Sequence, residues 1–441
     1  MAHPHISLII VSRDRAEALS SALNCLRFQT VSGFETIVVS NLPATTGPAP
    51  APLAHYDCQP ANISLARNIG LAKAKGDIVV FCDDDCLPDP RFIELITAPF
   101  ADRHVGAAGG MSRGTNGVAM QWQAVSFGRD GRDKPLTIDL RKPWTVFAPE
   151  PERFIKTVGT ACAFRADALR AIGGFDEGYR YYFDETDVNL RLSEAGWSTA
   201  IVPTAQVHHA FAAGPHRDRR RMPTDMFEIG ASAARFCTLH VARDSGAALN
   251  AQRRNLRNRL HNYHLLGLIS GQRLRFLLAR LDEGIAQTFA NFTPPPKLEP
   301  IPVPGPQISL PEPQPRLHFL LEGSLARMRP LARALAEAGH VVTVLEIRAT
   351  IRPLWAFFDA DGFWYHRGGL FGRIKRNETL LNLRTKPQYL AVELRRLAWF
   401  RRVNYMICDR KPTSPALILP ELKTIENIDS MTVIDLQSNT P

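Results

Sequence analysis

Residues 78–86 read IVVFCDDDC, an apolar run that ends in the consecutive aspartates Asp83, Asp84 and Asp85. The β-branched and aromatic residues predict a buried strand, whereas consecutive aspartates are poor strand formers and repel one another. In open α/β sheets ligands gather outside the carboxyl ends of the strands. Hard cations such as Mg²⁺ and Mn²⁺ prefer carboxylate oxygens. The stretch therefore predicts an α/β sheet with a cation-binding edge.

A plainer interpretation of the same acids stays open. Asp89 and Pro90 suit the N-cap and first position of a helix, so the aspartates could form a solvated acidic turn before it. Cys82 and Cys86 lie close together, but no second thiol pair or nearby histidine completes a tetrahedral zinc site.

Strand-like and helical patterns alternate upstream of the aspartates. Residues 6–11 and 36–39 are apolar runs typical of buried strands, and residues 16–28 and 64–75 carry helical periodicity. This alternation predicts a mainly parallel sheet.

A second acidic cluster follows about one hundred residues later. Asp184, Glu185 and Asp187 fall in the first turn of a predicted short helix, directly after the aromatic residues 181–183. Acids at this place can simply stabilise a helix terminus. An aromatic wall would also raise the pKa of a carboxyl, as a general base for a hydroxyl requires. His208 and His209 then follow a strand-like segment, where one of them is a candidate metal ligand or phosphate contact.

The charge of the chain is unevenly distributed. The 441 residues carry 53 Lys and Arg against 43 Asp and Glu, a net charge of +10. Thirteen Arg and four acids lie between His216 and Arg280, so this segment holds most of the excess. Arg217 to Arg221 suggest a loop that closes over a diphosphate, and the arginines of 253–259 suggest a helix that meets a phosphorylated acceptor or an anionic membrane.

Cysteine content and hydropathy restrict the class of protein. Seven scattered cysteines argue against a disulfide framework, and neither a signal peptide nor an apolar run of bilayer length is visible. We expect a cytoplasmic protein, with peripheral contact on the inner membrane face as an option, rather than an integral membrane protein.

Ten prolines within residues 294–315 predict a semi-rigid linker. Beyond it, residues 317–345 read as one strand–helix–strand unit, and Trp355, Trp364 and Trp399 with neighbouring arginines suggest an interaction surface or core aromatics. The predicted domains are 1–215 as a catalytic domain, 216–292 as its Arg-rich helical extension, 293–315 as the linker and 316–441 as a small α/β domain.

The ordered series of motifs over residues 6–281 resembles glycosyltransferase family 2, the inverting enzymes of GT-A fold that use nucleotide-sugar donors. The matching motifs are residues 10–15 (IVSRDR), Gln29, 64–70 (SLARNIG), the aspartate triplet, 159–165 (GTACAFR), 173–176 (GGFD), the acids at 184–187 and the histidine pair. Residues 316–347 resemble, over a short stretch, the start of a GT-B glycosyltransferase. The implied fold class is α/β, with a Rossmann-like mixed sheet of the nucleotide-diphospho-sugar transferase type, then a helical segment, the linker and a small second α/β region.

The resemblance also implies site residues. Glu185 would be the catalytic base, with Asp184 open as the alternative and Asp187 in the same cluster. Metal ligands would be Asp83 and Asp85 with His208, or His209 in its place. Contacts to the nucleotide sugar would come from Val11, Ser12, Arg15, Asn41, Arg67, Asn68, Asp83, Asp84, Gly159 and Thr160.

The predicted function is that of a hexosyltransferase-type enzyme using Mn²⁺ or Mg²⁺. It would move a sugar from a nucleotide-diphosphate donor to a hydroxyl of a glycan, polysaccharide or lipid-linked precursor. Two alternatives remain, a nucleotidyltransferase of similar fold and a non-catalytic glycan- or anion-binding module. A nucleic-acid partner is not expected, because the aspartates would face the ligand crevice.

Overall fold

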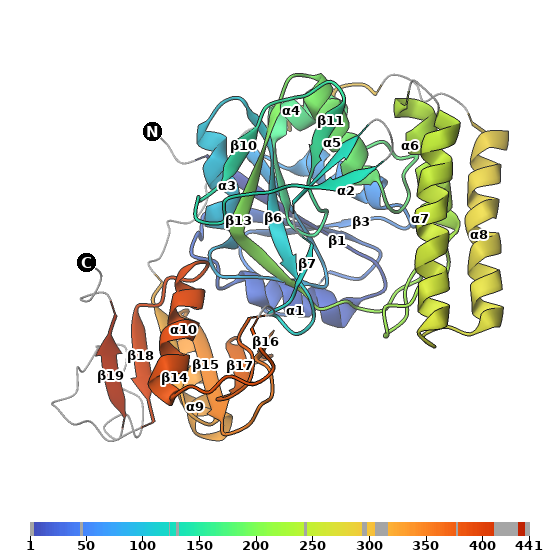
Figure 1. Cartoon of the computed structure of the whole chain (residues 1–441). Helices are drawn as coiled ribbons and strands as arrows, with labels where there is room; N and C mark the ends of the chain where they lie inside the picture. Colours follow the sequence, from blue (N-terminus) through green and yellow to red (C-terminus); the bar gives the residue numbers. More distant parts are fainter. Residues whose placement is uncertain are drawn as a thin grey trace.

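Two α/β units and a helical hairpin make up the protein in a computed structural model (Figure 1). The structure describes residues 4–44, 47–122, 124–128, 132–241, 245–292, 298–304, 316–375, 378–409 and 431–436. The predicted linker falls largely outside these residues. Its described part, 298–304, lies against the first unit, where the Ile301 amide donates to the carbonyl oxygen of Arg170 at 3.1 Å. The domain boundaries themselves stay predictions.

The first unit is organised around a mixed sheet of ten strands within the described residues. Eight of them follow the order β10-β13-β6-β12-β4-β1-β2-β3, while β5 pairs with β13 and β7 with β6. Neighbours in β4-β1-β2-β3 and in β13-β6 run parallel, and β12 is antiparallel to both β4 and β6. The strands are β1 (Ile6–Ser12), β2 (Phe34–Ser40), β3 (Leu53–Asp57), β4 (Ile78–Asp83), β5 (Cys86–Pro88), β6 (Val105–Arg113), β7 (Met120–Trp122), β10 (Thr145–Phe147), β12 (Cys162–Arg165) and β13 (Ser198–His209).

Helices cover both faces of this sheet, because alternate residues of a buried strand point to opposite layers. Leu8 and Ile10 of β1 pack in one core with α1 and α3, whereas Ile9 packs in the other core with α2, α4 and α5. The sequence prediction of an α/β fold with a parallel-rich mixed sheet is confirmed. These helices are α1 (Ala16–Leu26), α2 (Ile63–Lys73), α3 (Phe92–Thr97), α4 (Ala166–Ala171) and α5 (Asp184–Glu194).

Three helices stand together at one side of the sheet (Figure 1). They are α6 (Phe227–His240), α7 (Ser245–Leu265) and α8 (Gly271–Ala290), and α7 and α8 form an antiparallel hairpin. Leu256 and Leu260 of α7 and Leu277 and Leu281 of α8 share a core with Met226, which joins the hairpin to the first unit. A small sheet is formed by β8 (Val125–Gly128), β9 (Asp133–Pro135) and β11 (Arg153–Lys156), and its Phe127 and Phe154 pack in one core with Phe236 of α6.

The C-terminal unit, residues 316–436 as far as described, carries its own sheet in the order β16-β17-β15-β14-β18-β19. The predicted strand–helix–strand unit is present as β14, α9 and β15, with β14 and β15 parallel. The elements are β14 (His318–Glu322), α9 (Leu325–Glu337), β15 (Val341–Arg348), β16 (Trp355–Phe358), β17 (Trp364–Gly369), α10 (Lys386–Ala398), β18 (Tyr405–Cys408) and β19 (Thr432–Asp435).

A buried ion pair joins the two α/β units. The Arg401 guanidinium donates to Asp89 Oδ1 through Nε at 2.9 Å and Nη2 at 2.6 Å, and neither side chain is more than 1% exposed. The prediction that Asp89 caps a helix is therefore wrong. Helix α3 begins three residues later, at Phe92, and the carboxylate of Asp89 is used across the interface instead. Trp364, predicted as part of an interaction surface or as a core aromatic, is buried in the same place beneath Arg401 and so is a core aromatic.

Replacing Arg401 with Met should lower the free energy of unfolding by about 3–5 kcal/mol, because it leaves the Asp89 carboxylate buried without its partner. Urea denaturation of the full chain measures this loss. Arg402→Met is the matched control, since the neighbouring Arg402 is exposed and should change stability little. Adding Asp89→Asn to Arg401→Met removes both charges and should recover part of the loss. Equal midpoints for Arg401→Met and wild type would contradict the assignment.

Candidate active site

A cavity of about 340 Å³ opens at the carboxyl ends of β1 and β4. It lies where the sheet rule places ligands. Its polar lining is rich in groups of both signs, since four arginines stand beside two aspartates. The residues of interest along its wall are Val11, Ser12, Arg13, Arg15, Asp83, Asp85, Arg180, Tyr181, His209, Phe211, Ala212, His216 and Arg217.

The three consecutive aspartates have different surroundings. Asp83 and Asp85 line the cavity, but Asp84 is fully buried and does not. Asp84 accepts a hydrogen bond from Ser12 Oγ at 2.6 Å and pairs with Arg15 Nη2 at 2.9 Å. Burial raises the pKa of Asp84 to about 7 despite these partners. Asp84 therefore holds Ser12 at the end of β1 and the Arg15 side chain in place. It does not line the cavity, although the sequence prediction made it a contact of the nucleotide sugar.

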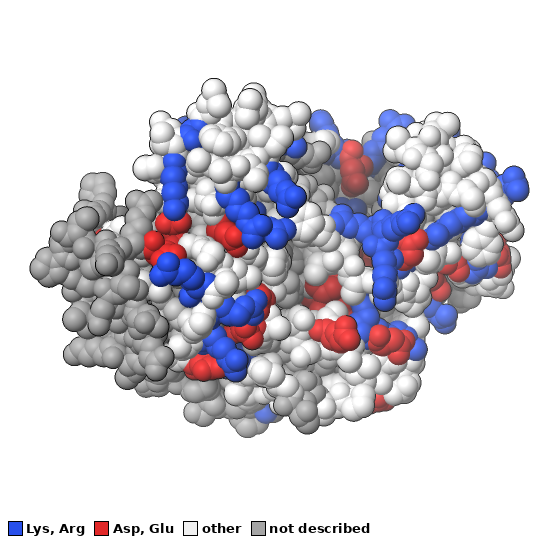
Figure 2. Space-filling view, turned by 90° about the horizontal axis from the view of Figure 1, so that it is seen from below, with Lys and Arg blue, Asp and Glu red and all other residues white. Residues whose placement is uncertain are grey.

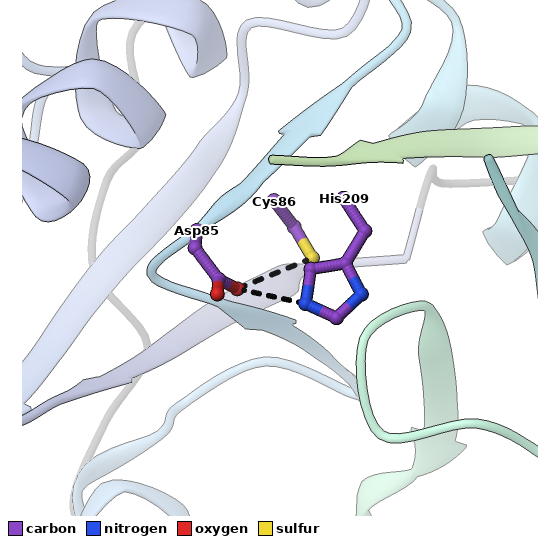
Figure 3. A group of neighbouring side chains, drawn as sticks. All are labelled: Asp85, Cys86 and His209. Carbon is purple, nitrogen blue, oxygen red and sulfur yellow. Dashed lines mark hydrogen bonds and ion pairs between the residues drawn. The ribbon is translucent and has the colours of Figure 1, made fainter. Parts of the chain in front are cut away.

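Asp85 forms the centre of a polar cluster with His209 (Figure 3). Its Oδ1 lies 3.2 Å from His209 Nε2, and its Oδ2 accepts from the Ala212 amide at 3.0 Å and Arg15 Nη1 at 3.1 Å. Burial alone would raise the pKa of Asp85, but the hydrogen bond and charge of His209, with Arg15 and the Ala212 amide, lower it. Asp85 is therefore an ionised carboxylate at the cavity wall.

The neighbouring His208 faces the opposite side of β13. It is 4% exposed, its ring lies against Trp364 of the C-terminal unit, and its Nε2 is 3.5 Å from Asp89 Oδ2. Burial lowers the pKa of His208 to about 4, so the ring is neutral. Of the two histidines offered as metal ligands, the structure thus brings the alternative, His209, to Asp85, and it places His208 in the interface between the units.

Arg67 connects the two acidic clusters. Its side chain is 3% exposed, its Nη1 binds Asp184 Oδ2, and its Nη2 lies 3.5 Å from Asp83 Oδ1 and from the Gly159 carbonyl oxygen. A Cβ on Gly159 would stand 2.7 Å from Arg67 Nη2, so only glycine leaves room for this guanidinium. The acids of β4 and of α5 therefore meet through one buried cation.

Glu185 differs from its neighbours Asp184 and Asp187. Burial and the adjacent Asp184 charge raise the pKa of Glu185 to about 8, against the attraction of Lys156 and Arg67. Asp187 points elsewhere, since it binds Arg191 at 2.5 Å and His240 at 2.7 Å, and these partners lower its pKa although burial opposes them. Asp187 is therefore a structural acid in the fold, and the proton-accepting candidates are Glu185 and Asp184.

Comparisons with known proteins address the same region. A family model described as "Glycosyltransferase like family 2" matches residues 53–224, which include both acidic clusters and both histidines. Residues 53–224 are thus similar to glycosyltransferase family 2. With the mixed sheet described above, this confirms the predicted GT-A fold class for the first unit.

Similar proteins are also glycosyltransferases by name. An N-acetylglucosaminyl-diphospho-decaprenol L-rhamnosyltransferase of Mycobacterium tuberculosis is 38% identical over 84 residues, 18% of this chain and 27% of that protein. The uncharacterized glycosyltransferase YwdF of Bacillus subtilis is 27% identical over 47% of this chain and 74% of its own length. A pre-mycofactocin glycosyltransferase of M. tuberculosis is 27% identical over 47% of this chain and 43% of its own length. The chain thus spans about a quarter of the rhamnosyltransferase.

The glycosyltransferase family 2 region contains a candidate cation site. Within the described residues, Asp85, Cys86 and His209 form a group whose potential ligand atoms all lie within 4.8 Å of one another. Burial raises the pKa of the Cys86 thiol well above its usual value, which disfavours a thiolate in the absence of a metal. The ionised Asp85 and the imidazole of His209 remain, a donor set that suits Mn²⁺ or Mg²⁺ better than zinc.

Several predicted donor contacts have structural partners instead. Asn68 binds the backbone of Phe175 through both amide atoms, each at 2.8 Å, and Asn41 donates to Asp14 at 2.7 Å. Neither asparagine lines the cavity, nor do Arg67, Gly159 and Thr160. Thr160 Oγ1 is buried without a hydrogen-bond partner. Of the predicted donor contacts, Val11, Ser12, Arg15 and Asp83 line the cavity.

Backbone strain marks residues that sequence reasoning missed. Five non-glycine residues of the described chain have positive φ, namely Asp14, Tyr182, Phe183, Phe211 and Arg221. Such conformations persist only where surrounding structure enforces them, and they gather at functional sites. Phe211 stacks on His209 with ring centroids 3.8 Å apart, and Arg221 lies 3.8 Å above Phe211. Nothing in the local sequence distinguishes Phe211 or Arg180 as parts of the wall.

Proposed function

We propose that the chain is a metal-dependent, inverting glycosyltransferase that moves a sugar from a nucleoside-diphosphate donor to a hydroxyl acceptor. The proposal rests mainly on Arg67, which binds an acid of each cluster beside one cavity. The first cluster offers ligands for a divalent cation, and the second contains Glu185, a carboxyl with a raised pKa. Displacement at an anomeric carbon needs these two sites, because negative charge develops on the leaving diphosphate while a proton leaves the acceptor.

The cavity suits a nucleoside diphosphate. Arg13, Arg15, Arg180 and Arg217 supply guanidinium groups that can form paired hydrogen bonds with phosphate oxygens. Tyr181 stacks on His216 with centroids 4.0 Å apart, which gives the wall a flat aromatic surface. Asp83, Asp85 and His209 would hold the divalent cation, which when bound would neutralise charge on the diphosphate.

Glu185 is proposed as the base. Its carboxylate takes the proton of the acceptor hydroxyl, and the acceptor oxygen forms a bond to the anomeric carbon as the bond to the diphosphate oxygen breaks on the other face. The bond forms opposite to the one that breaks, so the configuration inverts. Asp184 is held by Arg67 and so is less free to accept a proton. The proposed acceptor is a hydroxyl on a glycan or a lipid-linked sugar.

Donor use is tested with a panel of nucleotide sugars, measuring nucleoside-diphosphate release and sugar transfer with and without Mn²⁺. At least one donor should be consumed, and removal of the cation with EDTA should lower the rate at least tenfold. Release of pyrophosphate from nucleoside triphosphates would instead support a nucleotidyltransferase. Binding of a nucleoside diphosphate without consumption of any donor would instead support the non-catalytic binding module.

A further inference from the structure

The end of the α7–α8 hairpin exposes large apolar side chains. Leu265, Leu266 and Leu268 are 80%, 73% and 46% exposed. In an amphipathic helical hairpin such apolar side chains normally pack on the core. The hairpin does not need them for its own stability, since its core is made by buried leucines on the inner faces of both helices. We call residues 263–271 the hairpin end. The described part of the chain shows nothing covering these three leucines.

The hairpin end is an ordered turn and not a frayed terminus. The amide of Leu268 donates to the Tyr263 carbonyl oxygen at 2.9 Å, and that of Gly267 to His264 at 2.9 Å, with Gly267 at φ 69°. This pair of bonds terminates α7 in a fixed geometry that needs a left-handed residue. Ser270 then caps α8 by accepting from the Arg273 amide at 3.2 Å. The leucines are thus presented on a rigid support.

The two helices of the hairpin carry an excess of positive charge along their length. Residues 245–281 contain seven arginines and neither Asp nor Glu. Four of these arginines have acidic partners outside that range, namely Arg253 and Arg257 with Asp282, Arg273 with Asp218, and Arg280 with Asp225. Arg254 and Arg275 are exposed and have no ion pair within the described residues. Arg275 reaches back to the turn, where its Nη1 would lie 3.9 Å from a Cβ on Gly271.

The sequence predicted that the arginines of 253–259 meet an anionic partner. The ion pairs leave fewer of these arginines available for such a contact. Arg253 and Arg257 hold the two helices together through Asp282 and so belong to the hairpin itself. Figure 2 shows the molecule from below, where white, uncharged areas alternate with Lys and Arg and with Asp and Glu side chains.

We propose that the hairpin end is a docking site for an anionic phospholipid bilayer. Apolar side chains that enter the headgroup boundary and arginines that meet anionic headgroups are the two features that hold an amphipathic segment at a membrane. Here Leu265, Leu266 and Leu268 supply the first, and Arg254 and Arg275 the second. No helix in the described residues is long and apolar enough to cross a membrane, so the contact is peripheral.

The docking site connects directly to the donor cavity. Arg273, in the first turn of α8, pairs with Asp218 at 3.1 Å and donates to the Pro223 carbonyl oxygen at 2.7 Å. These residues continue the loop whose His216 and Arg217 line the cavity. Resting on the proposed function, this connection would place the cavity beside acceptors carried by the bilayer, such as a lipid-linked sugar.

Sedimentation of the full chain with vesicles tests the docking. Vesicles of phosphatidylcholine with about one-third phosphatidylglycerol should bind the protein at least tenfold more strongly than phosphatidylcholine alone, and salt should weaken binding. The triple variant Leu265→Ser, Leu266→Ser, Leu268→Ser should lose at least tenfold in affinity. Arg254→Gln with Arg275→Gln should remove the preference for the anionic lipid.

Phe289→Ser is the matched control, because Phe289 is 51% exposed at the other end of α8, about 27 Å along the helix. It should bind vesicles as wild type does, and all variants should keep the wild-type thermal midpoint. The proposal would be overturned if the wild-type protein did not bind anionic vesicles, or if the triple variant bound them as the wild type does. So would concentration-dependent dimerisation that the triple variant abolishes, since the leucines would then face a second copy. Vesicle binding needs neither donor nor turnover, so its failure is distinct from failure of the transferase activity.

Discussion

Exchange of Glu185 for Gln is expected to lower the rate of sugar transfer by about 10²–10⁴-fold, the usual contribution of a general base. The amide keeps the shape of the side chain but cannot take the acceptor proton. Affinity for the nucleoside diphosphate should stay within about twofold, because Glu185 does not line the donor cavity. Turnover kinetics and calorimetric titration of the diphosphate measure the two quantities separately.

The pH dependence gives an independent check on the same residue. A base must be deprotonated, and the pKa of Glu185 is raised to about 8, so wild-type activity should increase as the pH rises toward that value. Glu194→Gln, at the exposed far end of α5, is the matched control and should behave as wild type. If Glu185→Gln leaves turnover unchanged, the role passes to Asp184.

Replacement of Asp85 with Asn should abolish most cation-dependent activity, on the order of 10²-fold or more, because the carboxylate that would neutralise the cation becomes a neutral amide. Saturation should require a higher Mn²⁺ concentration, and donor binding in the presence of Mn²⁺ should weaken. This second effect separates Asp85 from Glu185, whose substitution spares donor binding. The amide oxygen can still accept from Ala212, which limits structural damage.

Asp57→Asn serves as the control for Asp85, since it removes an exposed carboxylate at the end of β3 without reaching the cavity. An Asp85→Asn protein with an unaltered Mn²⁺ dependence would exclude Asp85 as a ligand. A fall in thermal midpoint without any change in Mn²⁺ dependence would assign the residue to the fold, through its contacts with Arg15 and the Ala212 amide.

The local sequence pattern was sufficient to predict the main strands of the sheet and the face of the chain on which each aspartate lies. The strand before the aspartates is β4, and the predicted strands and helices at 6–11, 16–28, 36–39 and 64–75 are present as β1, α1, β2 and α2, whereas β3 and β5 were not predicted. Alternation along an extended chain puts Asp83 and Asp85 on one side and Asp84 on the other, and the structure has this arrangement. These features depend on residues close in sequence, so periodicity reveals them.

The choice between His208 and His209 depends on register, which local pattern does not contain. Strand β13 pairs with β6 through an irregularity between Ile201 and Gln206, and beyond it His209 stands opposite Cys86 of β5. A one-residue shift exchanges the faces of a strand, so the irregularity decides which ring meets Asp85. The structural partner of Asn68 could not be predicted for a related reason, since Phe175 is 107 residues away.

The pair of Asp89 and Arg401 has a consequence for descent and engineering. The two residues are separated by 312 positions. Substitution of either one alone leaves the other as a buried, unpaired charge, whereas substitution of both together lowers the stability of the fold much less. Substitutions at these positions should therefore occur jointly among related sequences. A chimaera that exchanges the segment after the linker for one lacking an equivalent of Arg401 would inherit a defect in its transferase half, and such a graft should be rescued by neutralising Asp89.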